Sequence, residues 1–189
     1  MSGKLIIISA PSGCGKSTII SHLMERGNIQ MEFSVSATNR LPRPGETDGV
    51  NYHFLTTENF NDLISRGEFV EYEEVYPGRF YGTLKSEIQN RLDSGRNIIL
   101  DVDVKGGINV KRLYGDRALS IFIEPPSIEV LRSRLTNRGT EAPEVVEERV
   151  ARAEFEISMA PQFDAIVVNN NLDEAVGNAE RIITEFLNR

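Results

Sequence analysis

A glycine-rich segment near the beginning of the chain constrains the fold more than any other feature. The apolar run Leu5–Ser9 leads directly into APSGCGKST at residues 10–18, and a helical pattern begins at Lys16. This order fits the phosphate-binding loop G-x-x-x-x-G-K-S/T in a relaxed form, because Ala10 stands where the first glycine is usual. Such a loop joins a buried strand to a helix. The sequence therefore predicts a phosphate site at the end of the first strand.

Three further apolar runs share the pattern of the first. They are rich in isoleucine and valine and continuous rather than alternating, which is typical of strands buried on both faces of a parallel sheet. Strand–helix alternation predicts a doubly wound α/β fold. The expected strands are Leu5–Ser9, Asn97–Val102, Ala118–Ile123 and Ala165–Val168. The expected helices are Lys16–Arg26, Lys105–Leu113, Ser127–Thr136, Pro143–Ser158 and Leu172–Leu187, with Pro143 in a first turn and Asn171 or Asp173 as a cap.

Residues 33–83 interrupt this alternation with prolines and glycines. Shorter alternating stretches at Val50–Leu55 and Glu68–Val75 predict strands, and residues Thr57–Ser65 predict a helix. We therefore expect a small antiparallel sheet with one helix, inserted into the main fold. A second irregular segment, Asn137–Pro143, joins two helices that are rich in arginine and glutamate.

Composition narrows the classes of partner. The chain has 189 residues and a formal net charge of −7, which fits one domain and argues against a nucleic-acid partner. A small anionic nucleotide can still bind, because local arginines and backbone N–H groups act over short distances. The single cysteine, the absence of a recognisable signal peptide and the lack of a membrane-length apolar run predict a cytoplasmic protein with no membrane partner.

Each part of the glycine-rich loop has a chemical role. Gly13 and Gly15 allow consecutive N–H groups to face one concavity, and the helix beginning near Lys16 adds its positive end. Lys16 is expected to reach the outer phosphates of ATP, and the Ser17 hydroxyl to ligate Mg²⁺. The alternative is a glycine-rich turn that merely precedes a helix, which the register of Gly-Lys-Ser argues against. The expected ATP-binding residues of the loop are Ser12, Gly13, Cys14, Gly15, Lys16, Ser17 and Thr18.

Two arginines in the inserted segment indicate a second anion site. Arg40 and Arg43 lie in a loop punctuated by proline and glycine, flanked by Ser36 and Tyr52. Guanidinium groups bind phosphate bidentately, and the hydroxyls add neutral donors, so this set suits a monophosphate. Arginines in loops are, however, more often solvated than functional, and the residues alone leave that alternative open.

In combination these segments resemble the guanylate kinase family over essentially the whole chain. The resemblance rests on the loop at residues 10–18, Ser36-x-x-x-Arg40-x-x-Arg43 with Gly45-Glu46 and Tyr52, EFVE at 68–71, YGT at 81–83, ILDVD at 99–103, and RGT at 138–140 between Arg134 and Arg149. It implies a P-loop nucleoside-monophosphate kinase-like fold in one domain. That domain would comprise a core (1–32, 84–125 and 159–189), a GMP-binding insertion (33–83) and a helical lid (126–158).

The resemblance also implies a reaction and a role for each site residue. The reaction is transfer of the γ-phosphoryl group of ATP to GMP, and also to dGMP, with Mg²⁺ as cofactor. Ser17 and Asp101 would bind the metal, and Asn169 would contact the adenine. The implied catalytic residues are Lys16, Arg40, Arg134, Arg138 and Arg149. The implied GMP-binding residues are Ser36, Arg40, Arg43, Glu46, Tyr52, Glu71, Tyr81, Thr83 and Asp103, of which Ser36, Glu71 and Thr83 read the base.

Several of these assignments have simpler alternatives. Glu71 could be a solvent-facing strand residue, Asp101 and Asp103 could cap the next helix, and the lid arginines could form surface ion pairs with nearby glutamates. The chain also departs from the family in two places. Asn170 and Asn171 replace residues that are commonly acidic, which puts the hold on the ATP base in doubt, and Asn39 replaces a more usual threonine with little expected effect.

Three other functions compete with a GMP kinase. A kinase for AMP or a pyrimidine would leave Glu71 unexplained, and a P-loop hydrolase would leave Arg40 and Arg43 unexplained. A non-catalytic guanylate-kinase-like module that binds phosphopeptides typically has a degraded loop, whereas Gly15-Lys16-Ser17 is intact here. The sequence does not determine the oligomeric state, and a homo-oligomer stays open.

Overall fold

The apolar run that opens the chain forms the central strand of a parallel sheet in the computed structural model, which describes residues 3–137 and 142–189. All five residues of β1 (Leu5–Ser9) are buried. The strand order is β2-β7-β1-β8-β9, with β2 at Glu32–Phe33, β7 at Ile98–Asp101, β8 at Ala118–Glu124 and β9 at Ala165–Val168. Ile8 of β1 aligns with Asp101 of β7, so the loop after β1 begins beside the carboxyl end of β7.

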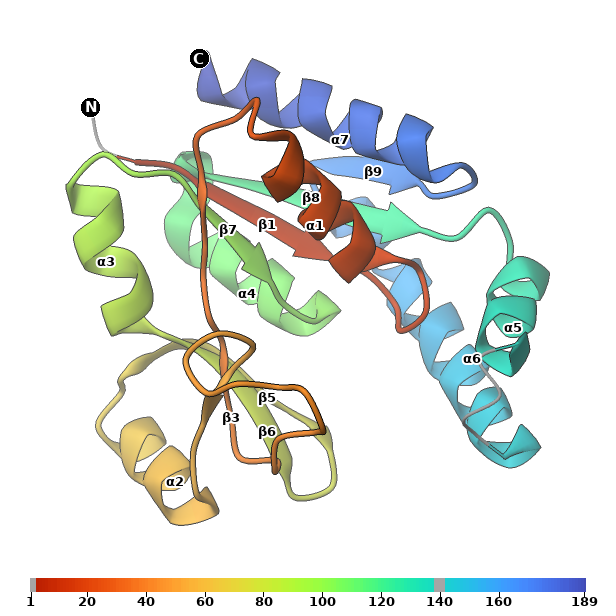
Figure 1. Cartoon of the computed structure of the whole chain (residues 1–189), viewed down its shortest axis with the longest axis horizontal. Helices are drawn as coiled ribbons and strands as arrows, with labels where there is room; N and C mark the ends of the chain where they lie inside the picture. Colours follow the sequence, from red (N-terminus) through yellow and green to blue (C-terminus); the bar gives the residue numbers. More distant parts are fainter. Residues whose placement is uncertain (1–2, 138–141) are drawn as a thin grey trace.

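Helices cover both faces of this sheet, as Figure 1 shows. Alternate residues of β1 belong to different apolar clusters. Ile6 and Ile8 pack with α1 (Lys16–Arg26) and α7 (Leu172–Leu187), whereas Leu5 and Ile7 pack with α3 (Lys85–Asp93) and α4 (Val104–Tyr114). The predicted doubly wound α/β fold is confirmed. Short 3₁₀ turns, η1 (Gly115–Arg117) and η2 (Ala160–Gln162), precede β8 and β9.

Two helices extend away from one end of the sheet (Figure 1). They are α5 (Ile128–Asn137) and α6 (Pro143–Ser158), which pack against each other through Leu131, Leu135, Val146 and Val150. Pro143 stands in the first turn of α6 as predicted. Of the two caps considered for α7, Asn171 is the residue used, since its side chain accepts a hydrogen bond from the Glu174 N–H.

The inserted segment forms a second sheet with strand order β4-β3-β6-β5. Its strands are β3 (Ala37–Thr38), β4 (His53–Phe54), β5 (Phe69–Tyr76) and β6 (Arg79–Leu84), and α2 (Thr57–Ser65) covers it. Phe60 of α2 stacks on Phe69 with ring centroids 4.5 Å apart. The expectation of an antiparallel sheet was wrong in part, because β3 and β4 pair in parallel.

The strand expected over Val50–Leu55 is also much shorter than predicted. Only His53 and Phe54 are in β4. The Asp48 carboxylate accepts a hydrogen bond from the Phe54 N–H at 2.8 Å, and the Asn51 side chain accepts one from the Thr47 N–H at 2.8 Å. Such local side-chain bonds give the backbone an alternative to a strand ladder.

Strands β2, β3 and β6 and helix α3 were not predicted individually. Among the helices of residues 3–137 and 142–189, none has both the length and the apolar character needed to cross a lipid bilayer.

Candidate active site

The phosphate loop lies at the carboxyl end of β1 and opens into the first turn of α1. Gly13 and Gly15 have φ of 94° and 85°, in the left-handed region that favours glycine. A Cβ at Gly15 would lie 2.5 Å from Asn169 Nδ2, so a side chain there is excluded by space as well. No side chain caps α1, and no acidic residue stands in its first turn. The N-terminal N–H groups of the helix are therefore available to an anion.

Lys16 and Ser17 both face Asp101, the carboxylate at the end of the neighbouring strand β7. Lys16 Nζ donates to the Val102 carbonyl at 2.9 Å and forms an ion pair with Asp101. Ser17 Oγ lies 3.4 Å from Asp101 Oδ2. The Asp101 charge raises the pKa of Lys16 although burial of the ammonium acts against it. Lys16 is therefore a charged group held in place beside the loop.

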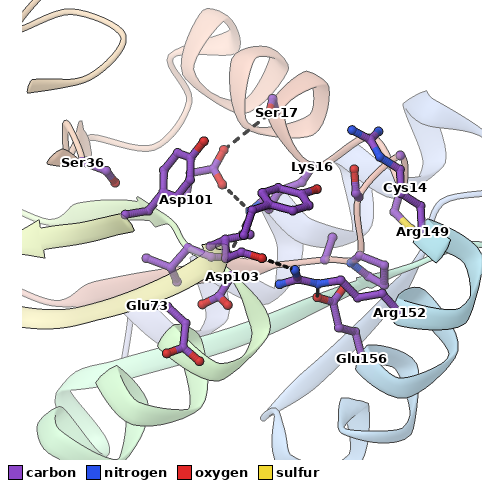
Figure 2. Close-up of a pocket in the computed structure, with 18 of the residues that line it drawn as sticks. Cys14, Lys16, Ser17, Ser36, Glu73, Asp101, Asp103, Arg149, Arg152 and Glu156 are labelled. Atoms are coloured by element: carbon purple, nitrogen blue, oxygen red, sulfur yellow. Dashed lines mark hydrogen bonds and ion pairs between the residues drawn. The ribbon is translucent and has the colours of Figure 1, made fainter. Parts of the chain in front are cut away.

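A cavity of about 370 Å³ joins this loop to the inserted sheet. Figure 2 shows Lys16, Asp101 and Asp103 at its centre, Ser36 on one side and Arg149, Arg152 and Glu156 on the other. Its lining includes most of the residues that the sequence analysis singled out: Ser12, Gly13, Cys14, Gly15, Lys16, Ser17, Thr18, Ser36, Tyr52, Glu71, Tyr81, Asp101, Asp103 and Arg149.

Glu71 is a buried carboxylate at one wall of this cavity, only 8% exposed. The solvent-facing alternative for it was therefore wrong. Thr83 Oγ1 donates to Glu71 Oε1 at 2.7 Å within the buried sheet. Burial raises the pKa of Glu71 to about 7, although the Thr83 hydrogen bond opposes this. A buried carboxylate that is held by the hydroxyl and the backbone of Thr83 can still accept two parallel donors from a ligand.

Asp103 stands close to Glu71 and caps the helix that follows it. Its side chain caps α4 by accepting a hydrogen bond from the Gly106 N–H at 2.8 Å, so the helix-cap alternative holds for this aspartate. A Cβ at Gly106 would lie 2.7 Å from Glu71 Oε2 and 2.8 Å from Asp103 Oδ1. Glycine at 106 therefore lets the start of α4 approach both carboxylates.

Arg40 does not line this cavity, but it contacts Tyr52, which does. Its Nη1 and Nη2 donate to the two oxygens of Glu46, each at 2.7 Å, and its guanidinium lies 4.9 Å from the centre of the Tyr52 ring. The Arg43 N–H donates to Glu46 at 2.7 Å, while the Arg43 side chain is exposed. The two arginines thus share one loop but not one environment: Arg40 is oriented by a carboxylate, and Arg43 faces solvent.

A second cavity, of about 530 Å³, lies on the other side of the loop. Arg134 and Asn169 line it together with Asn170 and the loop residues Gly13, Gly15 and Thr18. Asn169 Nδ2 donates to the Cys14 carbonyl at 2.8 Å, and Arg134 Nη2 donates to the Asn169 carbonyl at 2.9 Å. Arg134 therefore reaches the phosphate loop indirectly, through Asn169. Among the described residues, the arginine of α5 that pairs with a glutamate is Arg132, with Glu147.

Arg138, which the resemblance implies is catalytic, lies outside the described residues. Cys14 is buried, and burial raises the pKa of its thiol to about 12, so it stays protonated at neutral pH.

Sequence reasoning missed part of the cavity wall. Arg152, Glu156, Glu73 and Tyr76 line the cavity but were not singled out. For Arg152 and Glu156 a signal existed, because they follow Arg149 by three and seven residues and so share its helix face. For Glu73 and Tyr76 the alternating strand gave no reason to prefer them over their neighbours.

Comparison with known proteins agrees with this geometry. The guanylate kinase family model matches residues 2–186. A guanylate kinase of Bacteroides thetaiotaomicron is 56% identical over 189 residues, which cover 100% of this chain and 92% of that relative. Another, of Chlorobium chlorochromatii, is 52% identical over 98% of this chain and 97% of its own length. The crystal structure of guanylate kinase from Anaplasma phagocytophilum has a TM-score of 0.80 and 32% identity, covering 97% of this chain and 86% of that chain. The chain therefore belongs to the guanylate kinase family, as the resemblance of its motifs predicted.

Proposed function

We propose that the two cavities described above are the acceptor and donor sites of an ATP:GMP phosphotransferase. Membership of the guanylate kinase family makes this chain a transferase that binds ATP and GMP. The observation that carries the site assignment is the single cavity in which the buried Glu71 carboxylate and the Lys16 loop face each other. A carboxylate that could recognise a base and a phosphate-binding loop in the same cavity fit a binding site for a nucleotide acceptor.

Glu71 supports guanine as the acceptor base. Guanine presents two parallel donors, the ring N1–H and the exocyclic amine, which match the two oxygens of a carboxylate. Adenine has an acceptor at N1, so it would leave the carboxylate facing a lone pair. A buried polar group left without a partner costs about 1–3 kcal/mol, which supports strong rejection of AMP. Thr83 fixes the carboxylate, and Ser36 and Asp103 complete the proposed base site.

We propose that the acceptor phosphate binds where Tyr52 and Tyr81 line the cavity, within reach of Arg40 behind them. Arg40 and Tyr52 are already in contact, and Tyr81 lies beside Tyr52 with ring centroids 5.8 Å apart. Arg43 is exposed on the same loop and would turn inward to complete the set. Glu46 orients the Arg40 guanidinium, so its proposed role is positioning and not direct contact.

Transfer needs positive charge and alignment more than acid–base chemistry. Lys16 is fixed at the loop, and Arg149 lines the same cavity from α6. Arg134 donates a hydrogen bond to the Asn169 carbonyl and so lies close to the loop. The adenine and the outer phosphates of ATP would bind in this region. We propose direct in-line transfer to the GMP phosphate without a phospho-enzyme, with Arg138 as a further contributor on the basis of the resemblance alone.

The donor set fits Mg²⁺. Ser17 Oγ and Asp101 Oδ2 are oxygen atoms 3.4 Å apart beside the phosphate loop, and Mg²⁺ prefers such hard oxygen ligands together with phosphates and water. When bound, the ion would neutralise phosphate charge. Ser17 would contribute its hydroxyl, and Asp101 would hold both that hydroxyl and Lys16 in orientation.

We also propose that the core (1–32, 84–125 and 159–189), the GMP-binding insertion (33–83) and the lid (126–158) move as three bodies during closure. A cytoplasmic location rests on the sequence features given above, and homo-oligomer formation stays open.

The direct test is ADP release measured with GMP, dGMP, AMP, CMP and UMP as acceptors. We expect turnover with GMP and dGMP, and little with the other three. Lys16→Met, expressed and purified in parallel, controls for a contaminating host kinase. No turnover with any acceptor would refute the assignment as an enzyme, and faster turnover with AMP than with GMP would refute the guanine site.

A further inference from the structure

Helix α6 places a second arginine on the cavity. Arg149, Arg152 and Glu156 are spaced by three and four residues, so they share one face of the helix, and all three line the cavity. In Figure 2 the Arg152 side chain reaches from α6 toward Asp103, with Glu156 directly beside it. The neighbouring stripe of the helix, Val146, Val150 and Ala153, belongs to the main apolar cluster. The helix therefore packs one stripe into the core and turns the adjacent stripe to the cavity.

Arg152 bonds to a segment that lies far away in the sequence. Its Nη1 donates to the Val75 carbonyl at 2.5 Å, and its Nε donates to Glu156 Oε1 at 2.8 Å. The guanidinium also lies 5.5 Å from the centre of the Tyr76 ring. One planar group thus connects helix α6 with strand β5, and it is fixed from two sides.

The carbonyl is available because β5 is irregular at this point. Glu74 pairs with Phe80, whereas Tyr76 pairs with Arg79, so Val75 is an extra residue in the ladder. A bulge of this kind leaves its extra residue outside the regular strand pairing, and bulges are frequent beside active sites. The geometry of the strand therefore presents an acceptor to α6.

A simple surface ion pair does not account for this arrangement. Glu156 is only 8% exposed, and burial raises the pKa of its carboxyl, while the hydrogen bond from Arg152 opposes that rise. A glutamate in this position needs its arginine, because a buried carboxylate without a partner is costly. Surface pairs such as Arg132 with Glu147 carry no such requirement.

We propose that Arg152 is a positioning residue for phosphoryl transfer: it joins the strand that carries Glu71 to the helix that carries Arg149. Glu71 lies four residues before Val75, and Arg149 lies three residues before Arg152. The bond therefore sets the distance between the proposed base reader and a proposed transfer arginine. This inference rests on the proposed roles of Glu71 and Arg149, and it adds how their positions are coupled.

The kinetic test compares Arg152→Met with Arg132→Met, a matched arginine of the lid that lies on its surface. We expect Arg152→Met to lower kcat/KM for GMP by about 10- to 100-fold, because small displacements of reacting groups have effects of that size. The KM for ATP should change by less than about twofold, as should all constants of Arg132→Met. In the Glu71→Gln background, the further loss on Arg152→Met should be smaller than in the wild type, because both changes act on one site.

A distance measurement supplies a readout that does not need turnover. Spin labels at Arg79→Cys on the hairpin and Glu154→Cys on α6 occupy exposed positions, and the protonated, buried Cys14 should not react with the label. We expect a narrow distance distribution with GMP and ADP bound, and a broader one after Arg152→Met. Arg152→Lys, which has one donor nitrogen in place of the two that bond Glu156 and Val75, should lie between the two.

The proposal would be overturned by unchanged distances, or by a kcat/KM for GMP that is the same in Arg152→Met as in Arg132→Met. So would equal losses for ATP and GMP that follow a lowered melting temperature, since these indicate a merely structural role. Failure of the wild-type protein to phosphorylate GMP would instead refute the proposed function, and the distance measurement would still decide whether Arg152 joins the two segments.

Discussion

The replacement Glu71→Gln tests the base-reading site most sharply, because it keeps the shape of the side chain and removes its charge. Hydrogen bonds to a charged partner contribute about 1.5–3 kcal/mol each. Glutamine keeps one oxygen for guanine, but it turns an NH₂ group toward the second guanine donor. Losing one charged bond and leaving one donor unpaired amounts to about 3–4 kcal/mol, which is a fall of about 10²- to 10³-fold in kcat/KM for GMP.

The same replacement should stabilise the ligand-free protein at alkaline pH. Burial raises the pKa of Glu71 from its ordinary 4.5 to about 7 in the folded state. Between these values the folded protein holds the proton more tightly than the unfolded chain does. Its stabilising contribution is therefore complete below pH 4.5 and lost as the pH rises through 7. At pH 8 the ionised carboxylate lowers the free energy of unfolding by about 3 kcal/mol, and glutamine lacks this effect.

Two measurements check these expectations together. Steady-state kinetics with GMP and ATP varied separately should show the loss for GMP, with the KM for ATP within about twofold of wild type. Urea unfolding of the ligand-free proteins should show a larger advantage for Glu71→Gln at pH 8 than at pH 5. Glu68→Gln, an exposed glutamate just before the same strand, is the matched control. Unimpaired use of GMP by Glu71→Gln, or lower stability than wild type at pH 8, would refute the reasoning.

Three further predictions concern other parts of the site. In the wild type, kcat/KM for GMP should fall as the pH drops below about 7, because guanine requires the Glu71 carboxylate; a pH profile of Glu71→Gln without that step is the check. Arg40→Lys should raise the KM for GMP by about 10-fold or more, since lysine cannot reproduce the bidentate geometry seen with Glu46, and an unchanged KM would remove Arg40 from the phosphate site. Asn169→Ala should raise the KM for ATP several-fold and leave that for GMP unchanged, and titration with ADP measures the same effect without turnover.

The parts of the fold that sequence predicted are those in which a local pattern records burial. Continuous apolar runs correspond to β1, β7 and β8 because helices cover both faces of these strands. The run at β9 was expected to be buried in the same way, but Ile166 and Val168 of this edge strand are exposed. Helix α3 was not predicted because its sequence, KSEIQNRLD, gives little apolar pattern. Only Ile88 and Leu92 of this helix are buried. Strand β2 is two residues long and exists only because β7 offers it an edge, and no local signal specifies such a partner.

The site residues likewise differ in whether a local sequence pattern fixes their position. Lys16, Ser17 and Asp101 were predictable because a glycine-rich loop and a strand end fix where their side chains go. Glu71 looked like one of several glutamates on an alternating strand, and only its buried bond with Thr83 distinguishes it from its neighbours. Arg152 depends on a bulge in β5, which is a property of the paired strands and not of either sequence alone.

The charge arrangement explains how a chain with a net charge of −7 can hold two anionic nucleotides and still select between anions. Lys16 pairs with Asp101, and Arg40 pairs with both oxygens of Glu46. Because each cation already has a carboxylate partner, an isolated phosphate gains little by displacing that partner. GMP would gain more at Arg40, since the proposed contacts of its base at Glu71 would add to those of its phosphate. In this proposal the carboxylates keep both cations oriented, and Glu46 makes binding of the acceptor phosphate at Arg40 depend on recognition of the base.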